Sequence, residues 1–276
     1  MKQRFTSATV MLLLVSVGMA CSLTSKTPLT WHILLETDAA GSDLQILIPR
    51  TVTIIEQRLN AAGVPSFRVV AQGSPPNGRI LVNLAEVPDR QRLIELITSR
   101  GQLELTAIVS PPSPSPVQAY NSKDAAVASL GGKVPENRSV LPYTERNDPF
   151  AAQQNSADTE KAREWVVIET PAIVDGNEIR NAAARHESGQ DYHVSFALKA
   201  NGAERLGAWT GAHLNDYIGV VLNGEVKSIA YIRSQIHDQG EISGRFSKHA
   251  AEDLALILRL GPLPSPVRIV EQGSNK

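Results

Sequence analysis

The sequence predicts an α+β protein that combines a ferredoxin-like subdomain with a second α+β subdomain built on an antiparallel sheet. Strand and helix patterns follow one another in the order βαββαβ over residues 31–109, which is the order of the ferredoxin-like unit. A strand with alternating apolar residues spans 192–198, and an Asn-Gly pair at 223–224 separates two further β-rich runs. We therefore expect two sheets, each packed against helices.

The composition is that of an ordinary globular protein. Its 276 residues are long enough for two small domains or one large one, with 42% apolar and 20% charged residues. The formal net charge is −1, so the chain has no electrostatic basis for binding nucleic acid or anionic lipid. Nucleic acid is not an expected partner.

The N-terminus has the pattern of an export signal. Lys2 and Arg4 precede an apolar run from about residue 8 to residue 20. A helix of about 13 residues is about 20 Å long, which is too short for a hydrocarbon core of about 30 Å. Residues 1–21 are therefore interpreted as a signal peptide, and residues 22–30 as a short tether.

Cys21 is the only cysteine of the chain and lies at the end of this signal. Its position resembles the lipobox of bacterial lipoproteins, in which the cysteine is lipidated and becomes the mature N-terminus. Ala20 fits that pattern, whereas Gly18 departs from the usual Leu and Met19 is less common there. A plain secretory signal is the alternative. We expect an exported chain with a lipid anchor at Cys21, on either the inner or the outer membrane, and without disulfides.

The first subdomain is predicted from residues 31–109. In its first strand, Trp31, Ile33 and Leu35 alternate with the intervening residues. A helical pattern starts at Pro49, which suits a first turn, and ends at Gly63, which suits a C-cap. The remaining elements are strands at 67–70 and 79–84, a helix from Asp89 to Gly101, and a fourth strand at 103–109.

Residues 110–160 are interpreted as a Pro-rich, low-complexity linker or insertion. The segment from Ser110 to Pro116 contains four prolines, which favour extended geometry and cannot continue a sheet ladder. The residues up to 159 show little periodicity, which is typical of a long loop or a partly disordered insertion. A Pro-rich motif that docks to a partner domain is the alternative.

The second subdomain is predicted from residues 161–262. Strands are expected at 165–168, 192–198, 217–222, 225–232 and 241–246, and helices at 203–213 and from Ser247 to Gly261. Asn223 and Gly224 both tolerate positive φ, which predicts a tight hairpin. Ser247 is a favourable N-cap. A last strand is expected at 267–270.

The motifs of common catalytic sites do not occur in the sequence. It has no Gly-x-Gly-x-x-Gly, P-loop or His-Glu-x-x-His pattern, and no serine in a nucleophile elbow. His186 and His193 bracket Glu187 and Asp191, but these residues are interpreted as a solvated surface and not as a metal site. We expect no enzyme activity, cofactor or metal, although a triad assembled from distant residues stays an open alternative.

Three aromatic residues are candidates for binding an extended polypeptide. Trp165, Phe196 and Trp209 fall on the apolar sides of predicted elements, where they could line a groove. The alternative is that each belongs to the core of the second subdomain. Edge strands of its open antiparallel sheet could also accept a peptide by β-addition.

Seven fragments of the sequence form a recognisable series. They lie at 54–64, with an Arg-x-Asn-x-x-Gly-Val pattern, at 101–105, at Thr170-Pro171 with Gly176, at 220–226, at 241–246, at 251–256 and at Leu263-Pro264. In this order they resemble the first periplasmic domain of SecD, an accessory subunit of the bacterial Sec export machinery. The resemblance implies a base subdomain at 31–109 and a head subdomain at 161–262. It also implies that the strand at 267–270 returns to the base.

Two departures from the SecD pattern limit what the resemblance implies. The family's Asp-Leu-x-Gly-Gly motif is absent before Trp31. The sequence printed here ends at Lys276, so we expect a stand-alone, lipoprotein-like chain without the transmembrane bundle and without proton coupling of its own.

The expected function is therefore non-enzymatic. The first hypothesis is a SecD-like accessory protein that binds polypeptide or Sec translocase components on the exported side of the membrane. The alternative is a SecD-derived scaffold of the cell envelope that takes no part in translocation. A hydrolase is the third hypothesis and would require a cleft with a perturbed histidine or carboxylate.

Overall fold

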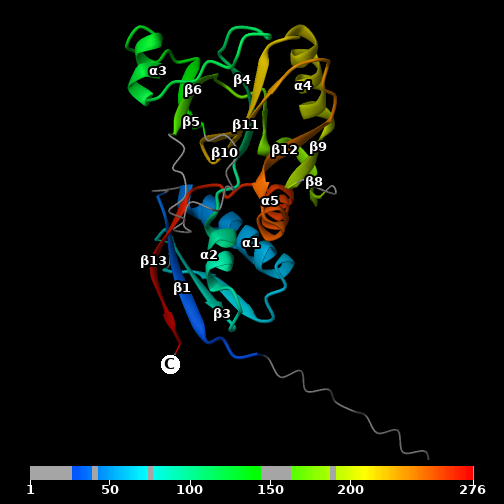
Figure 1. The fold of residues 1–276 in the computed structure, drawn as a ribbon. Helices are drawn as coiled ribbons and strands as arrows, with labels where there is room; N and C mark the ends of the chain where they lie inside the picture. The colour runs from blue at the N-terminus through cyan, green and yellow to red at the C-terminus, as the bar shows by residue number, and fades with distance from the viewer. Residues whose placement is uncertain (1–26, 39–42, 74–76, 144–162, 187–190, 276) are drawn as a thin grey trace, which may run out of the picture.

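The protein is an α+β structure with a base and a head stacked end to end (Figure 1). The computed structural model describes residues 27–38, 43–73, 77–143, 163–186 and 191–275. Cys21, the signal segment 1–21 and residues 22–26 of the tether lie outside the described residues.

The base is a four-stranded antiparallel sheet with helices on one face (Figure 1). Its strand order is β13-β1-β3-β2, formed by β13 (Val267–Ser274), β1 (Trp31–Thr37), β3 (Arg79–Leu84) and β2 (Phe67–Ala71). Helices α1 (Leu44–Ala61) and α2 (Arg90–Thr98) cover the face to which Trp31, Ile33 and Leu35 point. The strand alternation predicted for β1 therefore marks the core face.

Helix α1 begins earlier than predicted. It starts at Leu44, so Pro49 lies inside the helix instead of near its start. The proline deprives the helix of one hydrogen bond, and the buried Ile48 and Thr51 hold the surrounding turn in the core. The helix therefore starts five residues before the position that Pro49 predicts.

The prediction that residues 103–109 form the fourth strand of the base is wrong. This segment is β4 (Leu103–Ile108), and it pairs along its whole length with β10 (Tyr217–Leu222) of the head. Strand β13 instead lies beside β1. Gly101, with φ +71°, turns the chain away from the base after α2. Local patterning identifies a strand but not its partner, since pairing depends on where the chain goes next.

The centre of the head is a small closed sheet. Five strands pair in a ring, namely β4, β10, β11 (Glu225–Tyr231), β5 (Arg138–Tyr143) and β6 (Glu164–Glu169). β7 (Val174–Asp175) pairs with Glu104 and Leu105 in the N-terminal half of β4. Val166, Ile168, Val221 and Val226 fill the interior of the ring. The Asn223-Gly224 hairpin is confirmed, with φ values of +52° and +80°.

The interpretation of residues 110–160 as a linker is wrong for much of the segment. Helix α3 (Lys123–Ser129) and strand β5 form within it, and β5 completes the closed sheet. The Pro-rich part is anchored as well, because the Ser113 N–H donates to the carbonyl of Asn215 at 2.7 Å. Alternating proline and serine hide this order in the sequence, since the anchoring bonds come from a distant element. Residues 144–160 lie outside the described residues.

A second head sheet packs against the outer surface of β4 and β10. It is antiparallel, in the order β12 (Gln239–Phe246), β9 (Tyr192–Leu198) and β8 (Ile179–Arg185). Helices α4 (Ala200–Ala212) and α5 (Lys248–Leu260) pack with it around one shared core. A short 3₁₀ helix, Gly176–Glu178, leads into β8.

Helix α5 belongs to the cores of both the head and the base. Ala251, Leu254 and Leu258 lie in the head core, whereas Leu256 and Ile257 lie in the base core. Eight of the nine residues from Ala250 to Leu258 are buried, as expected for a helix that packs between two layers. It runs across the junction between head and base (Figure 1).

Two arginines of the base join α5 to the base helices. Arg92 of α2 makes a bidentate ion pair with Asp253 of α5, with both N–O distances at 2.7 Å. This pairing raises the pKa of Arg92. Arg58 of α1 is fully buried and donates to three backbone carbonyls, those of Leu96 at 2.9 Å, Ser99 at 2.5 Å and Gly261 at 3.2 Å. These carbonyls lie at the C-terminal ends of α2 and α5.

Replacing Gly101 by Ala is expected to destabilise the chain more than replacing Gly63 by Ala. Both glycines are left-handed, with φ values of +71° and +72°, so both substitutions carry a conformational cost of about 1 kcal/mol. An added Cβ meets nothing within 4 Å at Gly63, but at Gly101 it would lie 2.2 Å from Cγ2 of Ile257 in α5.

The free energies of unfolding of the two variants, measured by urea denaturation, should therefore differ by about 1–3 kcal/mol, the usual cost of overpacking a core. Equal losses of stability in the two variants would contradict close packing of Ile257 of α5 against Gly101.

Candidate functional site

The three predicted aromatic residues do not lie together. Phe196 is only 5% exposed and lies inside the head core. Trp165 is on β6 and packs with α3, where the Nζ of Lys123 lies 5.9 Å from its ring. Trp209 is on α4, only partly buried, and reaches a hollow in the head surface. Of the three, Trp209 alone borders a cavity identified among the described residues.

The hollow beside α4 has a volume of about 550 Å³. It lies where α4 faces the end of β4 and the segment after β6. Its walls are mostly apolar and are formed by Ala107, Glu169, Pro171, Ala172, Ile173, Arg205, Ala208 and Trp209. A hollow of this size and composition accommodates apolar side chains of a ligand.

Helix α4 positions the aromatic wall. Leu206 and Thr210 point into the head, and the Thr210 hydroxyl donates to the carbonyl of Leu206 at 2.7 Å. Ala208 on the other side is exposed, and Trp209 lies at the boundary. The Trp209 ring stacks on His213 with 4.2 Å between centroids, and His213 Nδ1 lies 2.7 Å from the carbonyl oxygen of Trp209. The indole is therefore held in place before any ligand arrives.

The charged groups of the hollow are paired within the chain. Arg205 donates from Nε to the carbonyl of Ile173 at 3.1 Å, and its Nη2 lies 3.3 Å from Oε1 of Glu178. Glu169 accepts from Arg138 at 2.5 Å. Because these charges already have partners, the surface offered to a ligand is chiefly the apolar one.

A second hollow, of about 430 Å³, lies at the junction of head and base. Arg100, Gln102, Asn223 and Pro266 are among its lining residues. The Gln102 N–H donates to Oδ1 of Asn223 at 3.0 Å, and the Asn223 N–H donates to the carbonyl of Gln102 at 2.8 Å. These two hydrogen bonds connect the β10–β11 hairpin to the segment between α2 and β4. The polar groups of Gln102 and Asn223 that form them are therefore used within the chain.

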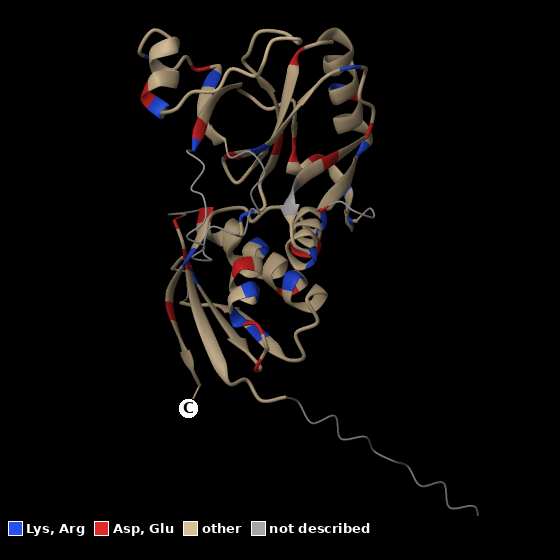
Figure 2. Ribbon diagram, in the orientation of Figure 1, with Lys and Arg blue, Asp and Glu red and all other residues tan. Residues whose placement is uncertain are grey.

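The histidines considered in the sequence have separate partners. His186 stacks on Tyr192 at 4.5 Å, and His193 lies 3.7 Å from a carboxylate oxygen of Glu241. Within the described residues, no group of three or more His, Cys, Asp or Glu side chains is placed to hold a metal ion. Lys, Arg, Asp and Glu are interspersed over the head and the base (Figure 2). The charge distribution therefore gives no reason to expect that a ligand is recognised by a patch of one sign of charge.

No helix in the part of the chain that the structure describes is both long and apolar enough to span a membrane.

The walls of the hollow were only partly visible in the sequence. Thr170-Pro171 was noted as a family fragment, and Trp209 as a candidate, but Ile173, Arg205 and Ala208 were not singled out. Ala208 and Arg205 lie on the solvent side of an amphipathic helix, where such residues are common and carry no signal by themselves. Their juxtaposition with Pro171 depends on the pairing of β4, which local patterning did not reveal.

Comparison with known proteins identifies the family. Residues 48–109 match the model described as "Protein translocase subunit SecDF, P1 domain, N-terminal", and residues 151–265 match "SecDF, P1 head subdomain". The chain is 30% identical to the protein translocase subunit SecD of Koribacter versatilis over 225 residues, which are 82% of this chain and 38% of that protein. It is 29% identical to SecD of Aquifex aeolicus over 226 residues, which are 82% of this chain and 39% of that protein. The chain thus spans about two fifths of the length of these curated relatives.

Solved structures share the fold. A crystal structure of SecDF in a super-membrane-facing form matches 89% of this chain and 30% of that one, with a TM-score of 0.65 and 24% identity. A second structure, of a SecDF membrane component described as enhancing protein export, matches 87% of this chain and 98% of that one, with a TM-score of 0.58 and 22% identity. Two family models in the right order, with relatives spanning both, confirm the predicted resemblance: the chain belongs to the SecD family and comprises its first periplasmic domain.

Proposed function

We propose that this chain is a non-enzymatic accessory protein of Sec-dependent export that binds exported polypeptide in the hollow beside α4. Its place is on the exported side of the membrane, with components of the Sec translocase as partners. The relatives are translocase subunits, which supports the export role. The proposed binding requires no proton coupling by the chain itself.

The observation that carries the proposal is the apolar hollow with a pre-positioned indole. An unfolded polypeptide presents apolar side chains that no folded core has yet buried. Trp209, Pro171 and Ile173 supply apolar area for such side chains, and the charges around them are paired within the chain. Contacts of this kind do not depend on a particular ligand sequence, as an export accessory requires.

The base gives the head a fixed support. We infer that the sheet β13-β1-β3-β2 with α1 and α2 is a ferredoxin-like unit whose fourth strand is β13, because its strand order and helix placement fit that fold. The head is then an insertion between α2 and β13. Because α5 is shared by both cores, the hollow is held in a defined position relative to the base.

Replacing Ala208 by Glu is expected to weaken polypeptide binding about tenfold, or about 1.4 kcal/mol. Ala208 is exposed and lines the hollow, so a carboxylate there opposes apolar contact without disturbing the core. The measurement is fluorescence anisotropy of the full chain with a labelled polypeptide kept unfolded by alkylation of its cysteines. Trp209→Ala should have an effect at least as large.

Ala212→Glu is the matched control, since Ala212 is exposed on the same helix and outside the hollow. It should bind like the unmodified chain. Equal weakening by both glutamates, or no binding by the unmodified chain, would contradict the proposed site. A photoreactive residue placed at position 208 could also be used. If it crosslinked only to a fixed envelope partner and not to exported chains, the scaffold alternative would be favoured.

We further propose that Cys21 carries the lipid that anchors the chain to the membrane. The support is its position at the end of an export signal. In cells fed a clickable fatty acid, the unmodified chain should acquire the label, and Cys21→Ser should lose it. Label that persists in Cys21→Ser, or secretion of an unlabelled chain, would contradict lipidation of Cys21 and would favour the alternative of a plain secretory signal.

A further inference from the structure

Strand β13 forms an outer edge of the base sheet. It pairs with β1 on one side and is the terminal strand in the sheet order (Figure 1). Residues 268–272 are all exposed, although they lie in a regular strand of eight residues. An edge of this length presents backbone N–H and C=O groups that can pair with another strand.

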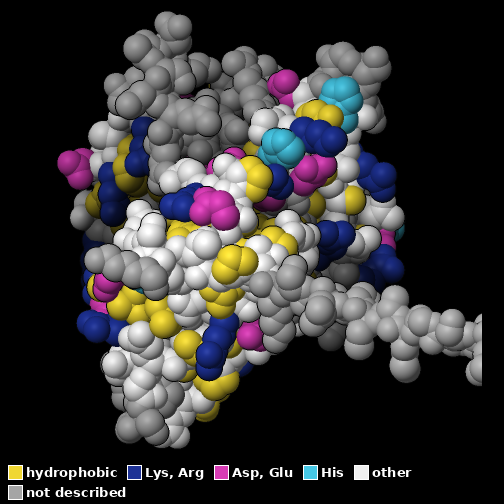
Figure 3. Space-filling model, turned by 90° about the horizontal axis from the view of Figure 1, so that it is seen from below, with side chains coloured by type: hydrophobic (Ala, Val, Ile, Leu, Met, Phe, Trp, Pro, Cys, Tyr) yellow, Lys and Arg dark blue, Asp and Glu magenta, His cyan; other side chains and the backbone are white. Residues whose placement is uncertain are grey.

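The exposed centre of β13 is apolar and flanked by opposite charges. Ile269 is 38% exposed and Val270 is 41% exposed, two of the few large apolar residues on the described surface. Arg268 precedes them and Glu271 follows, with side chains 63% and 65% exposed. At the base end of the molecule, apolar side chains reach the surface among basic and acidic ones (Figure 3). Neither Lys nor Pro, two residues that often block pairing at a sheet edge, occurs in β13.

The order Arg-Ile-Val-Glu is complementary to itself when reversed. In an antiparallel pair of two β13 strands, Arg268 of each lies opposite Glu271 of the other, and Ile269 opposite Val270. Such a pair has a two-fold axis, as closed homodimers do. Opposite charges directly across a strand pair are favourable, and like charges are unfavourable.

An irregularity in β13 brings Arg268 and Glu271 to one face of the sheet, as this register requires. Opposed residues of an antiparallel pair must point to the same face, whereas residues three apart in a regular strand point to opposite faces. Here the pairing with β1 shifts between Leu34 and Leu35, which leaves Val270 unpaired. Arg268 therefore contacts Glu36, and Glu271 lies 3.6 Å from His32. Glu36 and His32 share one face of β1, so Arg268 and Glu271 also share a face.

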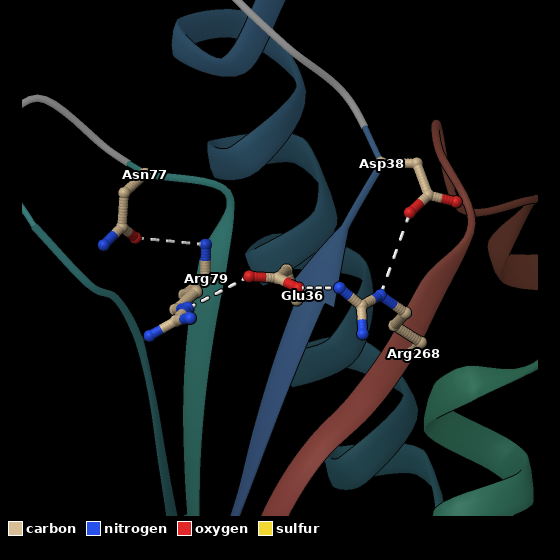
Figure 4. Close-up of polar contacts among 5 residues, drawn as sticks. All are labelled: Glu36, Asp38, Asn77, Arg79 and Arg268. Atoms are coloured by element: carbon tan, nitrogen blue, oxygen red, sulfur yellow. Dashed lines mark hydrogen bonds and ion pairs between the residues drawn. The ribbon is translucent and has the colours of Figure 1, made fainter.

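Arg268 is held at this face by an acidic cluster (Figure 4). Glu36 accepts from Arg79 of β3 at 3.1 Å and from Arg268 of β13, and Asp38 lies 3.9 Å from Arg268 Nε. Hydrogen bonding by Arg79, followed by the charges of both arginines, lowers the pKa of Glu36. The guanidinium has five N–H donors, so it can hold Glu36 and also meet a carboxylate across the edge.

We propose that two copies of this chain associate through β13, joined antiparallel in the register that places Arg268 opposite Glu271 of the other copy. The two base sheets then form one continuous eight-stranded sheet. This self-association is independent of polypeptide binding by the head.

Charge reversal tests the register. Full chain carrying Glu271→Arg, and separately full chain carrying Arg268→Glu, should each self-associate at least tenfold more weakly, because each faces like charges across the axis. An equimolar mixture of the two variants should regain a dimer, since every facing pair is then of opposite charge. Sedimentation equilibrium measures all three samples and the unmodified chain.

Arg79→Glu is the matched control. It removes an ion pair with the same Glu36 but lies on β3, away from the edge, so it should leave the dimer intact. In a Cys21→Ser background, a mixture of Ile269→Cys and Val270→Cys chains should form a disulfide between copies. An unmodified chain that stays monomeric up to about 1 mM would overturn the proposal, as would equal effects of Arg79→Glu and Glu271→Arg. The proposal would also be overturned if the equimolar mixture of the Arg268→Glu and Glu271→Arg chains did not regain a dimer.

Discussion

A buried guanidinium holds the molecule together. Arg58 is fully buried, and no carboxylate of the described residues pairs with it; its charge is met by backbone carbonyls at the ends of α2 and α5. The C-terminal end of a helix carries partial negative charge, so two helix ends partly replace the missing counter-ion. Burial lowers the pKa of Arg58 to about 10, which still leaves it charged at neutral pH. An arginine without these carbonyls would be a costly buried charge, so both helices must end at this point.

The position of the head follows from that constraint. Helix α5 enters from the head sheet, ends where Gly261 accepts from Arg58, and passes the chain to β13 of the base. Arg92 and Asp253 add a second link on the same helix pair. The hollow beside α4 belongs to the core that α5 supports, so a segment bound there would act on the base through a packed helix and not through a flexible tether. The exposed edge of β13 lies on the base, so it is available whether or not the hollow is occupied.

Much of the fold was predictable from local pattern, and its long-range pairing was not. The strand alternation in Trp31–Thr37, the Asn223-Gly224 hairpin and the Ser247 N-cap each depend on neighbouring residues and are confirmed. The assignment of β4 to the base failed because the pattern of a strand buried on both faces does not identify its partner, and β4 pairs with β10 of the head. Order within 110–143 was missed because its anchoring partners are not local: Ser113 bonds to Asn215, and Tyr120 and β5 pair with β6, beyond the end of the segment. For the site, Trp209 was recognisable as an aromatic residue on an amphipathic helix, whereas its partners Ala208 and Pro171 became meaningful only once α4 was placed against the segment after β6.

Calorimetry of the full chain tests most directly whether Arg58 and α5 join base and head into one unit. The account predicts a single unfolding transition whose calorimetric and van't Hoff enthalpies agree. It also predicts that Arg58→Met, which removes the donor to the buried carbonyl of Leu96 and to the partly buried carbonyls of Ser99 and Gly261, separates this transition into two. Two transitions in the unmodified chain, with the head transition unchanged by Arg58→Met, would show that the subdomains fold independently and would contradict the account.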